Sequence, residues 1–493
     1  MKKKFAMASR HRQHASRVRS PKVTTPASLE MNAYDSSHKG FHNIPGSICA
    51  PQGFRAAAVF CDIKKLGTGK GSEKGKKRDL ALIVSDVPAV VAGMFTSNQV
   101  CAAPARLSAG RAARKSARAI VVNSGNANAC TGRQGMKDAE EMTRITAETV
   151  AAFCSSRRRP AKADDRRHRK ISAEDVLVCS TGRIGVLMPM RNVERGIRAC
   201  APLLGRSVRY ARDTAEAIMT SDTERKEIAV EFSLGKRKVR IGGICKGAGM
   251  IQPLMTRGGK GAGLHATMLG FITTDAVVES RFLKRALERA VSQSFNRITV
   301  DGDMSTNDSV IMLANGLAGN RRLAGVSPHR RKFQSALDHV CLELARMIVR
   351  DGEGVSRFVT VRVRGARTAG EAAAAARAIA NSSLVRTSWC GGDPNWGRVL
   401  CAAGYSRARL DESKVDIGYS NPGERKILFA FRRGRPTTVV FASFTRITSR
   451  PEFDLHVDLH AGSGEFVMYA SDLTEDYVTF NKGDITDPGS LGG

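Results

Sequence analysis

Several kinds of residue and pattern are scarce in this chain of 493 residues. Aromatic side chains make up only 5% of it, which leaves little material for a surface that stacks on nucleic-acid bases. There is also no run of about 18 uncharged apolar residues, the length that a membrane-spanning helix needs. The most apolar stretch, residues 79–95, is interrupted by Asp86 and Pro88. The sequence therefore argues against a transmembrane protein.

The cysteines lack the spacing of either a metal site or a redox pair. All eleven are scattered between Cys49 and Cys401, with no Cys-x-x-Cys pair and no Cys/His cluster of zinc-site spacing. This pattern is typical of free thiols in a reducing compartment. We expect Cys130, Cys179 and Cys245 to be small buried packing residues, and we expect no bound metal or cofactor.

Positive charge is in large excess but is concentrated locally. The formal net charge is +33, and the basic runs lie near the N-terminus and at 66–78, 111–118, 157–170 and 320–332. We expect these runs to be solvated loops. A basic protein that associates with nucleic acid, and that has lost any catalytic activity, is kept as an alternative.

The N-terminal segment is a separate unit by composition. Residues 1–29 contain no acidic side chain and are rich in Arg, Lys, Ser and His. We predict a disordered basic extension over residues 1–40 and a cytoplasmic protein. If the extension is an organelle transit peptide, the compartment is the mitochondrial or chloroplast matrix instead.

Strand-like and helix-like patterns alternate along the rest of the chain. Short apolar runs at 56–60, 80–84 and 119–123 predict strands, whereas residues 137–153, 338–351 and 369–382 have helical patterns. The helix at 137–153 carries apolar residues at helical spacing, so we expect that face to pack on a sheet. The alternation predicts a mixed α/β fold.

Seven short motifs then occur in a fixed order between about Gly46 and Thr486. Together they resemble the ornithine acetyltransferase family, whose bifunctional members act in arginine biosynthesis and are also glutamate N-acetyltransferases. The motifs are NSGNANACTG at 123–132, STGRIG at 180–185, KGAGMI at 246–251, ATMLGFITTDA at 266–276, FNRITVDGDMSTND at 295–308, DGEG at 351–354 and GGDPNWGRV at 391–399.

The resemblance implies that Thr267 is the catalytic nucleophile. It also implies that the chain cleaves itself between Ala266 and Thr267. A threonine hydroxyl needs a nearby base, and the α-amine freed by cleavage, with a reference pKa of about 7.7–8.0, supplies one on the same residue. Thr181 and Gly182 are by resemblance the oxyanion hole, which stabilises the negative charge of the tetrahedral intermediate.

The resemblance also implies a set of substrate-binding residues. The Lys246 cation can meet a substrate carboxylate, although composition alone favours an ordinary surface lysine. The Glu353 carboxylate can accept charge-assisted hydrogen bonds from a substrate ammonium group. The full substrate-binding set is Thr220, Lys246, Thr267, Glu353, Asn481 and Thr486. We interpret the acidic DGDMSTND stretch as a structural or site-supporting loop, because its spacing is not that of a calcium-binding loop.

The implied fold is an α/β sandwich of the type shared by ornithine acetyltransferases and self-processing aminopeptidases. An α chain of residues 41–266 and a β chain of residues 267–493 share one core and assemble as an α₂β₂ heterotetramer. The implied reaction transfers acetyl from N2-acetyl-L-ornithine to L-glutamate, with acetyl-CoA as a second possible acetyl source.

One departure from the family pattern affects the cleavage point. Residues 256–265 stand between Met255 and Ala266, where family members run on directly. Such an insertion can slow self-cleavage, and Thr256 is a second candidate nucleophile, but the family register continues after Thr267. A self-processing aminopeptidase or amidase, in which water takes the acyl group, is the alternative within this fold.

Overall fold

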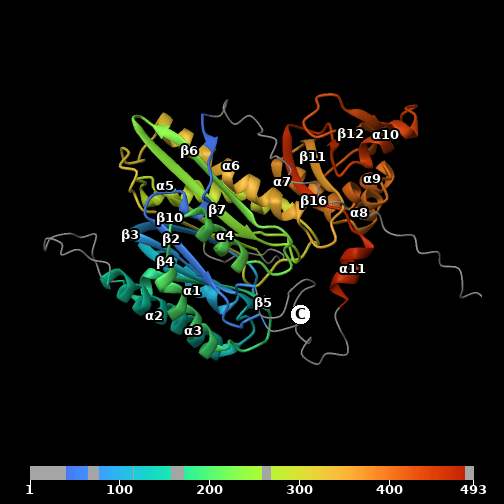
Figure 1. The fold of residues 1–493 in the computed structure, drawn as a ribbon. Coiled ribbons are helices and arrows are strands. Elements are labelled where there is room, and N and C mark those ends of the chain that lie inside the picture. Colours follow the sequence, from blue (N-terminus) through green and yellow to red (C-terminus); the bar gives the residue numbers. More distant parts are fainter. Residues whose placement is uncertain (1–39, 65–76, 115, 157–170, 258–267, 483–493) are drawn as a thin grey trace, which may run out of the picture.

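The computed structural model describes residues 40–64, 77–114, 116–156, 171–257 and 268–482. These residues form two β-sheets with helices packed on them (Figure 1). Within the described residues the larger sheet has nine strands and the smaller has seven. The mixed α/β fold predicted from the sequence is therefore confirmed.

The larger sheet contains strands from both sides of the predicted cleavage point. Strand β8 pairs antiparallel with β7 on one side and parallel with β10 on the other, so residues before and after position 267 share one sheet. The strand order is β1 (His42–Asn43), β6 (Lys226–Leu234), β7 (Arg237–Lys246), β8 (Leu269–Thr274), β10 (Ser309–Ala314), β3 (Leu80–Phe95), β4 (Ser116–Asn126) and β5 (Val176–Arg183), with β2 (Phe54–Val59) also paired to β3.

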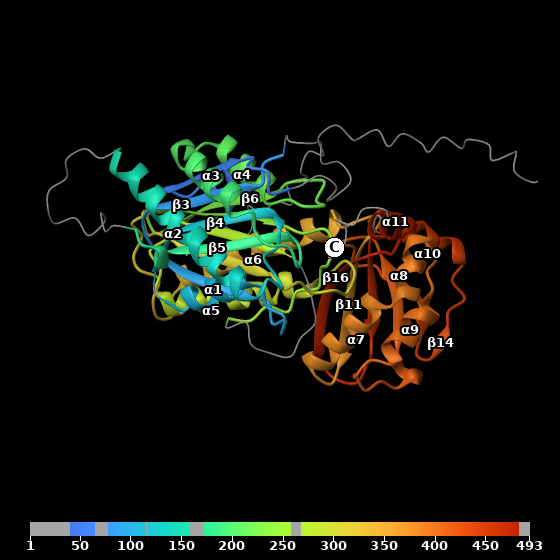
Figure 2. The same ribbon diagram turned by 90° about the horizontal axis from the view of Figure 1, so that it is seen from below.

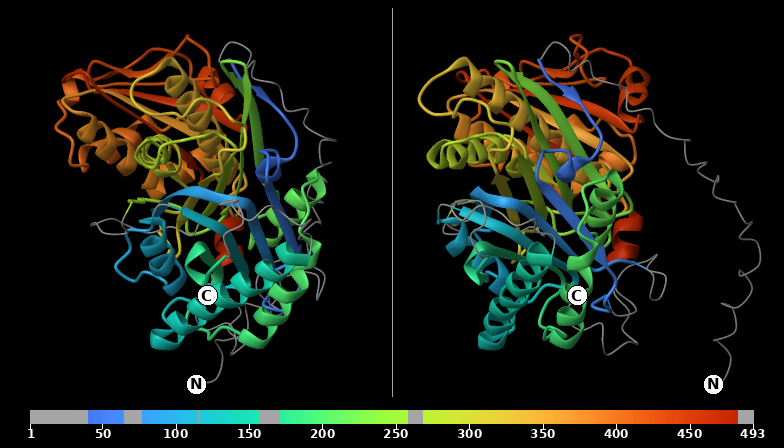
Figure 3. Two further views of the ribbon diagram at one scale, coloured as in Figure 1. Left: turned by 90° about the vertical axis from the view of Figure 1, so that its left-hand side faces the viewer. Right: turned by 60° about the vertical axis from the view of Figure 1, so that its left-hand side comes forward.

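One face of this sheet forms an inner core between its two halves. Leu177 of β5 and Ile120 of β4 belong to the same buried cluster as Ile244 of β7 and Phe271 of β8. Two views of the ribbon show the half made of β2–β5 layered against the half made of β6–β8 and β10 (Figures 2 and 3). The alternation of side chains along each strand leaves a second apolar face on the outside of each half.

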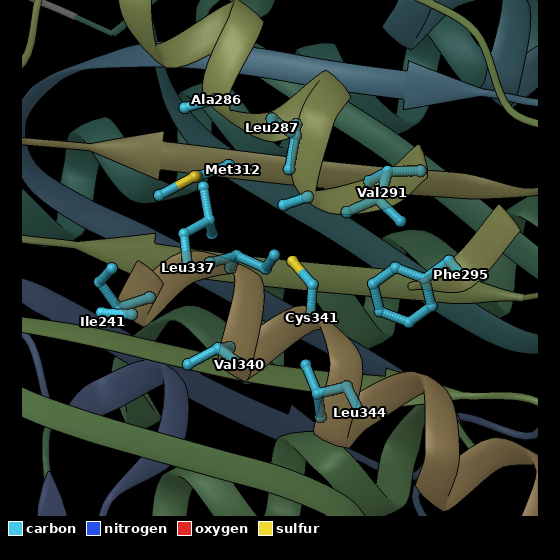
Figure 4. Close-up of a cluster of buried hydrophobic side chains, with 14 of the residues drawn as sticks. Ile241, Ala286, Leu287, Val291, Phe295, Met312, Leu337, Val340, Cys341 and Leu344 are labelled. Carbon is cyan, nitrogen blue, oxygen red and sulfur yellow. The ribbon is translucent and has the colours of Figure 1, made fainter. Parts of the chain in front are cut away.

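Helices cover both outer faces. Helices α5 (Ser280–Ser292) and α6 (Pro328–Arg350) present apolar residues at helical spacing and pack against each other. Helix α6 lies on β6 and β7, α5 lies on β3, and their side chains share one buried cluster with residues of β8 and β10 (Figure 4). Helices α1 (Ala103–Ala112), α2 (Gly132–Ser156) and α3 (Met190–Cys200) belong with the β2–β5 half. Helix α4 (Val208–Ala217) packs on β2. The result is a helix–sheet–sheet–helix sandwich.

The smaller sheet follows in the C-terminal part of the chain. Its own core lies between the sheet and the helices that pack on it. The strand order is β14 (Arg435–Pro436), β13 (Leu428–Arg432), β12 (Asp416–Ser420), β15 (Glu452–Asp458), β11 (Phe358–Ala366), β16 (Gly464–Ser471) and β9 (Ile298–Thr299). The helices of this part are α7 (Ala369–Asn381), α8 (Ser383–Cys390), α9 (Trp396–Gly404), α10 (Phe441–Thr448) and α11 (Glu475–Asn481).

The predicted strands and helices are present, but most of them extend beyond the predicted bounds. The run at 80–84 is the start of β3, which continues to Phe95. The helix predicted from residue 338 begins ten residues earlier, because Ser327 caps it and Pro328 occupies its first turn. Residues 328–332 are thus helical, and the prediction of a loop for that basic run was wrong there. It was also wrong for the ends of the run at 111–118, where residues 111–112 belong to α1 and residues 116–118 to β4. The helix predicted at 137–153 lies within α2, whose Met142 and Ile145 enter the core beneath it as expected.

The cysteine predictions are partly confirmed. All eleven cysteines lie in the described ranges and are free thiols, and Cys179 and Cys245 are buried. Cys130 is exposed, so the prediction of a buried packing residue was wrong. It lies in the turn between β4 and α2, where its backbone has a positive φ of 56°.

Other predictions fall wholly or mostly outside the described residues. These are the basic extension, most of the insert at 66–78 and the basic insert at 157–170. The division at residue 267 stays a prediction. Among the helices of the described ranges, none is both long enough and apolar enough to cross a membrane.

Candidate active site

Lys246 brings three of the predicted site residues together. It is the last residue of β7, and its Nζ atom donates hydrogen bonds to Thr220 Oγ1 at 2.6 Å and to Thr181 Oγ1 at 3.3 Å. The side chain is only 2% exposed, so the interpretation as a surface lysine was wrong. Burial lowers the pKa of Lys246, and the negative charge of Asp222 opposes that effect. The site thus has a buried ammonium group within reach of two threonine hydroxyls.

Thr181 and Gly182 lie at the end of β5, where the chain leaves the sheet. Gly182 has a φ of +129°, and a Cβ atom there would lie 2.4 Å from the carbonyl carbon of Gly125 in β4. Only glycine fits this close approach of two strands. The oxyanion-hole candidates are therefore held by β4, and Thr181 itself is fully buried.

The side chain of Asn307 ties the strand that carries Thr181 to the loop before β10. Asn307 Nδ2 donates to the carbonyl oxygens of Ser180 at 2.8 Å and Ala127 at 2.7 Å. Ser180 in turn donates from Oγ to Asn123 Oδ1 at 2.6 Å. This network of amides and hydroxyls joins β4, β5 and the start of β10.

Glu353 lies on the loop after α6 and faces the KGAGMI motif. A Cβ atom on Gly249 would lie 2.3 Å from Glu353 Oε2, and the Glu353 backbone N–H donates to the Ala248 carbonyl at 2.9 Å. Asn481 Nδ2 donates to Glu353 Oε2 at 2.9 Å. Burial raises the pKa of Glu353, opposed by hydrogen bonds from Ser221 and Asn481. The structure therefore brings Glu353 and Asn481 into direct contact.

The C-terminal helix α11 is docked on the same loop. Thr474 caps the helix, and its hydroxyl donates a 2.5 Å hydrogen bond to the Gly354 carbonyl. A Cβ atom on Gly354 would lie 2.3 Å from the backbone nitrogen of Tyr477. Glycine at position 354 is thus needed for α11 to bring Asn481 to Glu353.

Ala266, Thr267 and Thr486 lie outside the described residues. Met268, which directly follows Thr267, is described. Met268 is fully buried, and its carbonyl accepts a 3.1 Å hydrogen bond from the Ser309 backbone N–H. Leu269 is paired with Lys246 of β7 and with Ser309 of β10. The chain at Met268 thus lies between the end of β7 and the start of β10.

Asp308 is a site-proximal residue to which sequence analysis gave no role of its own beyond membership of the acidic DGDMSTND stretch. Its Oδ1 accepts a hydrogen bond from the Met268 backbone N–H, while its Oδ2 is buried without a hydrogen-bond partner among the described residues. Burial raises the pKa of Asp308 well above its ordinary value. The acidic DGDMSTND stretch therefore does support the site, as predicted. The signal in the sequence was its position directly before β10.

Two further residues bear on the sequence predictions. Thr256, the competing nucleophile, is held in a backbone bridge to Phe95, with hydrogen bonds of 2.8 and 2.9 Å.

Asp222 was missed by sequence analysis. It is fully buried two residues after Thr220, a position that could have suggested a role. Burial alone would raise the pKa of Asp222, but the ammonium groups of Lys226 and Lys246 outweigh it and lower that pKa.

Comparison with known proteins identifies the family. The model of the ArgJ family matches residues 56–484. The chain is 45% identical over 438 residues to the arginine biosynthesis bifunctional protein ArgJ of Symbiobacterium thermophilum, covering 89% of this chain and 98% of that protein. It is 41% identical to the glutamate N-acetyltransferase of Methanocaldococcus jannaschii, with the same two coverages.

Among solved structures, it is similar to an ornithine acetyltransferase from Mycobacterium tuberculosis complexed with ornithine. The identity is 33% and the TM-score is 0.36, covering 44% of this chain and 100% of that one. The family match and the curated relatives confirm the resemblance predicted from the motifs, and the chain belongs to the ArgJ family.

Proposed function

We propose that this protein is an acyltransferase that moves the acetyl group of N2-acetyl-L-ornithine to L-glutamate, producing ornithine and N-acetylglutamate for arginine biosynthesis. Family membership and the names of its relatives support this function. The observation that carries it is the buried Lys246 ammonium, 2.6 Å from Thr220 Oγ1 and 3.3 Å from Thr181 Oγ1, on the strand paired with the segment that follows Thr267. A buried cation beside hydroxyl groups suits a substrate carboxylate.

Maturation begins with Thr267. Its Oγ attacks the carbonyl carbon of Ala266, and the peptide becomes an ester as the acyl group moves from nitrogen to oxygen. Water then hydrolyses the ester. The products are an α chain that ends in the Ala266 carboxylate and a β chain that begins with the free amine of Thr267.

Transfer then proceeds in two halves. Thr267 Oγ gives its proton to its own α-amine and attacks the acetyl carbonyl of N2-acetylornithine, while Thr181 and Gly182 stabilise the oxyanion. The proton passes to the departing ornithine nitrogen, which leaves an acetyl ester on Thr267. The glutamate amine attacks that ester, N-acetylglutamate leaves, and the Thr267 hydroxyl is restored.

The other side chains bind the amino-acid part of both substrates. Lys246 and Thr220 meet the α-carboxylate, and Glu353, held by Asn481, meets an ammonium group. Thr486 is proposed to complete this set. In the same proposal acetyl-CoA also loads the acetyl group, the two chains assemble as an α₂β₂ heterotetramer, and the enzyme is cytoplasmic.

The test is a transfer assay on the purified protein. N2-acetylornithine and glutamate are supplied together, and ornithine and N-acetylglutamate are expected in equal amounts. Thr267→Ala is expected to form neither product, and Thr256→Ala is expected to act like the wild type. Release of acetate without N-acetylglutamate would instead identify a hydrolase of the aminopeptidase type. Full transfer by Thr267→Ala would reject the proposed nucleophile.

A further inference from the structure

A chain of three charged side chains, of which Asp222 and Lys226 are buried and Asp351 is partly buried, adjoins the segments that carry the proposed substrate-binding residues. Lys226, at the start of β6, is 1% exposed and donates from Nζ to Asp222 Oδ1 at 2.7 Å. The same Nζ atom forms an ion pair with Asp351, the residue that ends α6. Asp222, in the loop between α4 and β6, and Asp351, which caps α6, thus share one buried ammonium group although they are 129 residues apart in the sequence.

Asp222 joins two of the segments that carry substrate-binding candidates. Its Oδ2 accepts the backbone N–H of Thr220 at 3.0 Å, and its Oδ1 accepts the backbone N–H of Gly247 at 2.7 Å. Gly247 directly follows Lys246. One carboxylate therefore fixes the backbones beside Thr220 and Lys246 relative to each other.

Asp351 connects the loop that carries Asp222 to a third segment, the one that carries Glu353. It accepts the backbone N–H of Thr223 at 3.1 Å and that of Glu224 at 3.2 Å, from the loop that continues Asp222. Glu353 follows Asp351 by two residues. The three charges therefore link all three loops that carry Thr220, Lys246 and Glu353.

Stability alone does not account for this arrangement. Desolvating an ammonium and a carboxylate costs several kcal/mol per ion, and well-packed apolar residues of similar volume often serve stability as well or better. Backbone hydrogen bonds to a fixed carboxylate do what apolar packing cannot, because they set the direction and spacing of particular loops.

We propose that Asp222, Lys226 and Asp351 are positioning residues of the amino-acid site. They hold the Lys246 ammonium and the Glu353 carboxylate at the spacing that one amino-acid substrate requires. This inference rests on the proposed function, since it assigns the three residues to the binding of that substrate.

The charge on Lys246 depends on several neighbours. Burial disfavours its ammonium, and Asp222 is the strongest of the charges that oppose burial. The ionisable groups that face it are Lys64, Asp222, Lys226, Asp308 and Glu353. Removal of the Asp222 charge lowers the pKa of Lys246 further, so the site loses its cation at a lower pH.

The experiment compares Asp222→Asn with Glu224→Gln, a matched carboxylate-to-amide change on the same loop at an exposed position. Steady-state transfer between N2-acetylornithine and glutamate is measured across pH, and thermal unfolding checks the fold. For Asp222→Asn we expect KM for N2-acetylornithine to rise about ten- to hundredfold while kcat changes by less than about threefold. The alkaline limb of its kcat/KM profile moves to lower pH, and Glu224→Gln matches the wild type.

The outcomes separate the inference from the function on which it rests. Wild-type KM and pH profile in a folded Asp222→Asn protein would overturn the inference, as would equal effects in Glu224→Gln. If Asp222→Asn does not fold, the same kinetic measurements are made on Asp351→Asn. In that variant Lys226 keeps its ion pair with Asp222. A wild-type KM in Asp351→Asn would then overturn it. Absence of transfer in the wild-type protein rejects the proposed function instead.

Discussion

The backbone N–H of Met268 donates a hydrogen bond to the Asp308 carboxylate, which ties the residue after Thr267 to the start of β10. The hydrogen bond from the Ser309 N–H to the Met268 carbonyl continues the same pairing. Asp308 is fully buried, and its other oxygen has no partner among the described residues. The residue that directly follows the proposed nucleophile in the sequence is thus held next to a buried acid.

The protonation of Asp308 makes stability depend on pH. Burial raises the pKa of Asp308 well above its ordinary value of 3.8, so the folded protein holds this proton more tightly than the unfolded chain does. The associated stability is complete below that ordinary value and declines as pH rises toward the raised pKa. Asp308→Asn keeps an acceptor for the Met268 N–H and cannot ionise. Its unfolding temperature relative to wild type should rise between about pH 4 and pH 7.

Thermal unfolding of both proteins across that pH range is the measurement. Parallel curves would show that Asp308 does not bind its proton more tightly on folding. Asp308→Ala provides a second comparison, because it leaves the buried Met268 N–H without its acceptor. We expect it to be less stable than Asp308→Asn by about 1–3 kcal/mol.

The Thr181 hydroxyl is predicted to stabilise the oxyanion. Thr181→Ala should lower the rate of acetyl transfer by about 10²–10³-fold, and Thr181→Ser, which keeps the hydroxyl, should retain most of it. Single-turnover formation of the acetyl ester measures this step directly. An unchanged rate in Thr181→Ala would remove the hydroxyl from the mechanism.

Gly182 is predicted to be irreplaceable for steric reasons. Its φ is +129°, and an added Cβ atom would lie only 2.4 Å from the Gly125 carbonyl carbon, so Gly182→Ala should be less stable by at least about 2 kcal/mol. Gly110, exposed in α1 with open space around it, is the matched control. Gly110→Ala should be neutral or stabilising, by up to about 1 kcal/mol. Denaturant unfolding measures the stability of the two variants. Equal stabilities of Gly182→Ala and Gly110→Ala would contradict the close packing of β4 and β5.

The contact between Asn481 and Glu353 is predicted to set the pH below which substrate binding weakens. This pH appears as the acid limb of the plot of kcat/KM against pH. Burial raises the pKa of Glu353 and the Asn481 hydrogen bond opposes this, so Asn481→Ala should raise that pKa further. Glu353 binds an ammonium group only when ionised, so affinity falls as pH drops through its pKa. The acid limb of kcat/KM should therefore move to higher pH in Asn481→Ala and be absent in Glu353→Gln. An acid limb that stays in place in Asn481→Ala would show that α11 does not tune Glu353.

Sequence analysis identified most of the candidate site residues through the resemblance to the ornithine acetyltransferase family, which the ordered motifs carry. Thr181, Lys246, Glu353 and Asn481 were predicted in this way, and the structure brings Thr181 together with Lys246 and Glu353 together with Asn481. Asp222 and Asp308 were missed as site residues. The partners that explain them, Gly247 and Met268, lie 25 and 40 residues away, and no local pattern signals such pairing.

The length of β3 shows why strand boundaries were harder to predict. The prediction covered only residues 80–84, whereas β3 continues through Pro88, which lacks a backbone donor, to Phe95. In the folded protein β2 pairs with β3 only up to Ser85, and β10 pairs with it only from Val90. The register with β4 shifts between Val84 and Ala89. Pro88 lies where the partners change, so its missing N–H removes no ladder hydrogen bond.

The most direct test of the account is the intact mass and N-terminal sequence of the purified wild-type protein. Self-processing at the predicted bond yields two chains, the second beginning Thr-Met-Leu-Gly-Phe from Thr267, and Thr267→Ala yields a single uncleaved chain. A wild-type protein that stays at full mass after incubation, or a new N-terminus at Thr256, would contradict the assignment of Thr267 as the nucleophile.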